Sequence, residues 1–67
     1  MAAKPAHPRW TADYCRQESA MLTRTAEYFE SKARDDQRHT EAERCHFARL
    51  GRMCREDAKK WAERAAR

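Results

Sequence analysis

The sequence predicts an all-α protein, an antiparallel helical hairpin made of two long helices. The 67-residue chain contains no Val or Ile, two Pro and one Gly, so it lacks the β-branched residues that strands favour. Apolar residues recur with the helical period over two long segments. One polar stretch, residues 31–39, separates these segments and carries two adjacent aspartates, which is typical of a turn.

The core that this chain can build is small. It has two Leu and two Phe, and 13 of its 27 hydrophobic residues are Ala. A chain this short buries only about 60% of the surface that it exposes when unfolded. We therefore expect another chain to complete the fold, most simply in a homodimeric four-helix bundle. The alternative is a monomer in which long Arg and Glu side chains cover the exposed flank.

The first helix is expected over about residues 9–33. Residues 1–8 contain both prolines and predict a flexible N-terminal arm. The helix can start near Pro8, which suits a first turn, or at Thr11 as the N-cap with Asp13 in the first turn. The predicted core face consists of Tyr14, Cys15, Leu22, Thr25, Ala26, Phe29 and Ala33.

The turn is expected over about residues 34–39 and the second helix over about residues 40–66. Thr40 and Glu43 have the spacing of a capping box, and Asp36 is an alternative start. Gly51 could end the helix and divide the chain into three helices. The apolar pattern keeps its phase through Gly51, however, which favours one long helix that the first helix approaches closely there. The predicted core face consists of Phe47, Leu50, Cys54, Ala58, Trp61 and Ala65.

The hairpin prediction also gives an alignment of the two helices. Folding the chain back at about Asp35 places Cys15 level with Cys54, and Leu22 level with Phe47. A Cys15–Cys54 disulfide is then possible under oxidation. We expect the three cysteines to stay reduced and to serve as small apolar residues, because the count is odd and no disulfide framework repeats.

Two rows of large side chains flank the predicted core faces. The first helix carries Trp10, Met21 and Tyr28, and the second carries His46 and Met53. Because the sense of rotation reverses between antiparallel helices, both rows emerge on one side of the hairpin. Aromatic and Met side chains are enriched at protein interfaces. The sequence therefore predicts a protein-binding surface formed by Trp10, Tyr14, Met21, Tyr28, Met53 and Trp61.

Two other kinds of site are alternatives. Residues 44–67 carry eight Lys or Arg against three acidic residues, so RNA or non-specific DNA could bind the second helix. The outward cations of that alternative are Arg44, Arg52, Arg55 and Lys59. A weaker alternative is a di-metal site, because one Glu on one helix and Glu-x-x-His on the next is the pattern of carboxylate bundles. Its ligands would be Glu18, Glu43 and His46.

The function expected from these observations is that of a small non-enzymatic protein-binding or regulatory module, of the adaptor or inhibitor type. A two-helix chain is too small to enclose the roughly 300 Å³ of a typical ligand pocket, so we expect no catalysis and no cofactor. The absence of a long apolar run and of a secretory signal predicts a cytoplasmic protein with no membrane segment. In size and plan the predicted dimer is similar to ROP-type RNA-binding dimers.

Overall fold

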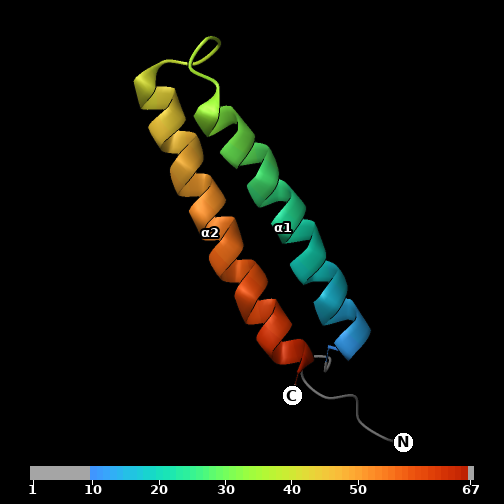
Figure 1. The fold of residues 1–67 in the computed structure, drawn as a ribbon. Coiled ribbons are helices and arrows are strands. Elements are labelled where there is room, and N and C mark those ends of the chain that lie inside the picture. The colour runs from blue at the N-terminus through green and yellow to red at the C-terminus, as the bar shows by residue number, and fades with distance from the viewer. Residues whose placement is uncertain (1–9, 67) are drawn as a thin grey trace, which may run out of the picture.

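The structure, a computed structural model, describes residues 10–66 as two antiparallel helices joined by one short turn. Helix α1 spans Ala12–Arg34 and helix α2 spans Glu41–Ala65. Figure 1 shows the two helices side by side along their whole length, with the turn at one end and the start of α1 and the end of α2 at the other. The all-α hairpin is confirmed, with no strand among the described residues. The expected arm, residues 1–8, lies outside them.

Both helices begin at a threonine cap. The Thr11 hydroxyl accepts a hydrogen bond from the Tyr14 amide at 3.0 Å, so α1 takes the later of its two possible starts. Thr40 and Glu43 form the expected capping box: the Thr40 hydroxyl accepts from the Glu43 amide at 3.2 Å, and Glu43 Oε1 accepts from the Thr40 amide at 2.9 Å. The alternative start of α2 at Asp36 is wrong, because Asp36 belongs to the turn.

Asp35 organises the turn between the helices. Its amide donates to the Lys32 carbonyl and ends α1. Its carboxylate Oδ1 accepts from the amides of Gln37 and Arg38, both at 3.3 Å. An aspartate that satisfies amides two and three residues further on stabilises a turn locally, which explains why the polar stretch reverses the chain at this point.

The interface between the helices is packed with small residues. Within the described part of the chain, the buried apolar side chains are those of Cys15, Ala26 and Ala58. Gly51 is also buried, and α2 continues through it without interruption, as the sequence pattern predicted. A β-carbon built on Gly51 would lie 3.4 Å from the Ala26 carbonyl oxygen and 3.6 Å from Phe29 Cβ. The missing side chain therefore lets the backbones approach each other.

The axial alignment of the helices differs from the one that the sequence predicted. The Ser19 hydroxyl donates to the Ala58 carbonyl at 2.8 Å, and Gly51 lies against Ala26. These contacts move α2 by about two helical turns, roughly 12 Å, relative to the predicted alignment. The predicted pairing of Cys15 with Cys54 is therefore wrong, and all three cysteines are free. Phe47 packs on Phe29, with ring centroids 6.2 Å apart, and not beside Leu22 as predicted.

Neither described helix is long and apolar enough to cross a membrane.

Candidate protein-binding surface

Four large side chains of the hairpin remain about half exposed and define what we call the Tyr/Met face. Tyr14, Met21 and Tyr28 lie on α1, and Met53 lies on α2. Their exposed fractions are 42%, 53%, 58% and 54% in that order. The three α1 residues are seven positions apart, which is nearly two helical turns, so they form one row along the helix.

The contacts of neighbouring residues show that both helices present these side chains on the same side. Arg55 of α2 binds Glu30 of α1 and marks one edge of the helix pair. Glu30 lies two residues after Tyr28, and Arg55 lies two residues after Met53. Two residues correspond to about 200° of rotation in an α-helix. Tyr28 and Met53 therefore both point away from the edge that holds the ion pair.

An aromatic cluster closes the end of the hairpin where α1 begins and α2 ends. The ring of Trp61 contacts Trp10 at 5.0 Å and Tyr14 at 5.6 Å between centroids, both edge to face. The Arg64 guanidinium lies 4.5 Å from the Trp61 ring centroid and 5.2 Å from that of Trp10. Trp61 is half-buried, whereas Trp10 is 50% exposed. The cluster extends the apolar surface beyond Tyr14 and fixes the position of Trp10.

At the other end of the face, Lys32 covers aromatic rings from both helices. Its ammonium group lies 4.8 Å from the Tyr28 ring centroid and 5.8 Å from that of Phe47. The His39 ring packs edge to face on Phe47 at 5.0 Å. The six residues predicted for protein binding are thus placed in two groups. Trp10 and Tyr14 both contact Trp61 where α1 begins and α2 ends, and Met21, Tyr28 and Met53 are exposed farther along the hairpin.

The structure does not bring together the three predicted metal ligands. Glu43 lies at the turn end of α2, and Glu18 lies sixteen residues before the end of α1, so roughly 24 Å of helix separates their levels. His46 is exposed near Phe47, with its ring centroid 6.0 Å from the phenyl ring. Among the described residues, no three His, Cys, Asp or Glu side chains are grouped to hold a metal ion. A single hairpin therefore does not assemble this site, and a di-metal site completed by two hairpins stays a prediction.

The four cations proposed for nucleic-acid binding are not equivalent. The prediction that all of them face outward is wrong for Arg44, which is half-buried with its Nε lacking a partner among the described residues. Arg55 is exposed but holds Glu30 through two hydrogen bonds. Arg52 and Lys59 remain exposed, seven residues apart on one row of α2. The structure therefore leaves half of the predicted basic set unengaged within residues 10–66.

Two carboxylates are held in their charged form by neighbouring groups. The pKa of Glu30 is lowered, chiefly by the hydrogen bond from Arg55, and the pKa of Arg55 is raised by the same bond. The pKa of Glu43 is lowered, first by the hydrogen bond from the Thr40 amide and then by the charge of His39, whose Nδ1 lies 3.6 Å from Glu43 Oε1. Both carboxylates therefore have partners within the hairpin that stabilise their charged form.

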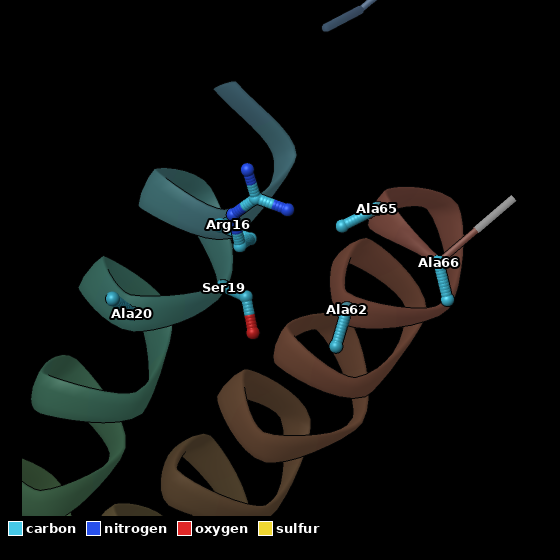
Figure 2. A pocket seen from close by; sticks show the side chains of 6 residues that line it. All are labelled: Arg16, Ser19, Ala20, Ala62, Ala65 and Ala66. Carbon is cyan, nitrogen blue, oxygen red and sulfur yellow. The ribbon is translucent and has the colours of Figure 1, made fainter. Parts of the chain in front are cut away.

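A groove of about 520 Å³ lies between the first half of α1 and the last turns of α2. Figure 2 shows Arg16, Ser19 and Ala20 of α1 opposite Ala62 and Ala65 of α2 and its C-cap residue Ala66. Arg16 forms an ion pair with Asp13, and the Ser19 hydroxyl donates to the Ala58 carbonyl. The remaining walls are alanine side chains. The groove therefore presents no nucleophile with an adjacent base.

Sequence reasoning missed the two cations that pack on the aromatic rings. Lys32 follows Tyr28 by four residues, and Arg64 follows Trp61 by three. Both spacings place side chains on neighbouring turns of one helix face, so the signal was present. Apolar periodicity does not reveal such a pair, because it counts a cation beside an aromatic residue only as polar.

No family model, curated protein or solved structure matches this chain. The Tyr/Met face and its two flanking cations are therefore interpreted from their own geometry and chemistry.

Proposed function

We propose that this chain is a non-enzymatic protein-binding module of the adaptor or inhibitor type. Its Tyr/Met face packs against helices of another polypeptide and so completes the core of the hairpin. A homodimeric four-helix bundle is the simplest such arrangement. We further propose that the protein works in the cytoplasm, where thiols remain reduced and its free cysteines would persist.

One observation carries the proposal: four large apolar side chains are about half exposed, whereas only small apolar side chains are fully buried among the described residues. Tyr14, Met21, Tyr28 and Met53 are 42–58% exposed, whereas the buried apolar side chains of the described residues belong to Cys and Ala. Fully burying a Met or similarly large side chain contributes roughly 1.5–3 kcal/mol. Covering the exposed halves of these four would therefore contribute on the order of 4 kcal/mol to a complex.

The composition of the face also fits protein and not nucleic acid. Met and Tyr are enriched in the centres of protein interfaces, and Met adapts its shape to irregular surfaces. Binding to nucleic acid is dominated by cations that contact phosphates. The cations beside this face, Lys32 and Arg64, lie over aromatic rings of their own chain.

Photo-cross-linking in living cells that express the chain tests the proposal. A benzophenone amino acid replaces Met21 in one variant and Met53 in a second. The matched controls carry it at Arg52 and Glu27, which are exposed away from this face. We expect protein adducts from positions 21 and 53 that are several times more abundant than those from positions 27 and 52.

The mass of the adduct identifies what covers the face. A product of twice the 8.0 kDa chain mass means a second copy, and a heavier product means another polypeptide. Adducts of equal yield at all four positions, or no protein adduct at positions 21 and 53, would show that the Tyr/Met face does not bind protein. Cross-linking to nucleic acid from position 52 alone would favour the basic alternative.

A further inference from the structure

We propose that the partner of the Tyr/Met face is a second copy of this chain, turned end for end. The two-fold axis crosses α1 at the level of Thr25. This inference rests on the proposed function, because it concerns the same face and names its occupant. It adds a specific arrangement, an antiparallel four-helix bundle, and the two residues that select it, Glu18 and Lys32.

The first step is the placement of these two charges on α1. Glu18 follows Tyr14 by four residues, and Lys32 follows Tyr28 by four residues. Residues four apart lie on the same side of a helix, so both charges border the Tyr/Met face. Both side chains are half-buried beside α2. Among the ion pairs that residues 10–66 form, none includes Glu18 or Lys32.

The second step is the symmetry of the charges and apolar groups around Thr25. Glu18 lies seven residues before Thr25 and Lys32 lies seven residues after it. A two-fold axis at Thr25 therefore places Glu18 of one chain opposite the partner's Lys32, twice in the dimer. Met21 and Tyr28 lie four residues before and three residues after Thr25. The same axis thus places Met21 beside the partner's Tyr28, within one residue of the same level.

The second helix follows the same symmetry. Because Gly51 lies against Ala26, the axis at Thr25 crosses α2 near Arg52. Met53 is then close to the axis and packs on the partner's α2. Asp57 lies five residues after Arg52 and His46 lies six residues before it, and both are exposed. The turned copy therefore places Asp57 near the partner's His46, which gives a second pair of acidic and basic groups.

The charges of Glu18 and Asp57 disfavour the alternative dimer, in which the two copies point in the same direction. If the two-fold axis ran along the helices, α1 of one chain would lie on α2 of the other at the same level. The contact of Ser19 with Ala58 shows that Glu18 and Asp57 lie at nearly the same level. That dimer would place Glu18 opposite the partner's Asp57. Like charges in contact cost several kcal/mol at an interface, whereas opposite charges fix the register.

Charge reversal on α1 tests the arrangement. Glu18→Lys places Lys opposite Lys, and Lys32→Glu places Glu opposite Glu, so each variant alone is expected to dimerise at least about tenfold more weakly than the unaltered chain. An equimolar mixture of the two variants restores both opposite-charge pairs. We expect native mass spectrometry of that mixture to show mainly the heterodimer, with dimerisation close to that of the unaltered chain.

Glu27→Lys and Arg34→Glu are the matched controls. They make the same changes in net charge on the other edge of the hairpin, where Glu27 acts on Arg55 and Arg34 acts on Glu30. Their mixture is expected to contain homodimers and heterodimers in statistical proportion.

A second control concerns the folding of the variants, because Lys32 also lies over the rings of Tyr28 and Phe47. The helicity and the thermal midpoint of each variant are therefore measured. If the mixture dimerises as tightly as the unaltered chain, the Lys32→Glu chain is folded.

The possible results separate this inference from the proposed function. In one outcome, Met21→Asp dissociates the dimer, but the two charge-reversal variants show no preference for each other. That outcome overturns the antiparallel arrangement and still supports the Tyr/Met face as a protein-binding surface. A chain that is monomeric at high concentration and forms heavier photo-adducts overturns the second copy alone. A monomer that yields no protein adduct overturns both.

Discussion

Arg55 of α2 reaches across the hairpin and holds Glu30 of α1 with two parallel hydrogen bonds. Nε donates to Oε2 at 2.7 Å, and Nη2 donates to Oε1 at 2.8 Å. This two-pronged geometry is the strongest form of an Arg–carboxylate contact. The ion pair connects the two helices at the edge opposite the Tyr/Met face. Among the described residues, no ion pair between the helices lies on the Tyr/Met face itself.

The ion pair predicts how acid changes the stability of the hairpin. The pKa of Glu30 lies below its ordinary value of 4.5 in the folded chain, chiefly because of the Arg55 hydrogen bond. The stabilisation is therefore present above the unfolded pKa and is lost as the pH falls through the folded pKa. We expect Glu30→Gln to lower the thermal midpoint at neutral pH, and the difference from the unaltered chain to shrink in acid. Far-UV circular dichroism melts measure both.

Glu56→Gln is the control for that experiment, because it removes an exposed carboxylate of α2 that forms no ion pair within residues 10–66. If Glu30→Gln and Glu56→Gln have equal effects at every pH, the contact between Glu30 and Arg55 does not stabilise the fold.

Gly51→Ala measures the closeness of the two helices. Ala is favoured over Gly inside a helix by about 1 kcal/mol. The new β-carbon would lie 3.2 Å from Glu30 Cγ, a tight contact with a side chain that Arg55 holds in place. We therefore expect the gain in unfolding free energy to fall short of about 1 kcal/mol in the unaltered background. Urea denaturation gives the value.

The same substitution in a Glu30→Ala background separates the two contributions. Removing the Glu30 side chain removes the tight contact, so Gly51→Ala should there stabilise the protein by the full amount. An equal effect in both backgrounds would mean that Gly51 does not lie against Glu30.

The helix caps predict different losses at the two N-termini. Replacing a capping Thr by Ala costs about 1 kcal/mol. The Thr11 and Thr40 hydroxyls each accept one amide, whereas the second bond of the capping box runs from the Thr40 amide to the Glu43 side chain. We therefore expect the double variant Thr40→Ala/Glu43→Ala, which loses both bonds, to lower the unfolding free energy by more than Thr11→Ala does, as measured by urea denaturation. An equal loss would contradict the capping box.

The alignment of the helices predicts the redox behaviour of the cysteines. Cys15 and Cys54 are offset by about 12 Å along the hairpin, whereas a disulfide requires Cα atoms within about 7 Å. Mild oxidation of the folded chain should therefore leave no intramolecular Cys15–Cys54 bond, as peptide mapping by mass spectrometry can show. In denaturant the same bond should become accessible. Rapid formation of the Cys15–Cys54 disulfide in the folded chain would instead support the alignment predicted from the sequence.

The sequence by itself determined the two helices, their caps and the turn. These features depend on neighbouring residues: Thr11 and Thr40 offer side-chain acceptors to amides three residues later, and the apolar period persists through Gly51. The flank positions of Met21 and Tyr28 are equally local, since spacing along one helix defines them, whereas Tyr14, which the apolar period assigned to the core face, is 42% exposed. Whether that row binds protein remains a prediction.

Only the tertiary structure decided how the helices slide against each other. The buried residues between the helices are Cys15, Ala26, Gly51 and Ala58, and such small residues allow several alignments with nearly equal apolar contact. The alignment is selected by contacts between distant residues, the Ser19 hydroxyl on the Ala58 carbonyl and Gly51 against Ala26. Those contacts depend on backbone proximity in three dimensions, which no periodicity along one chain encodes. They also place Glu18 of α1 at nearly the same level as Asp57 of α2.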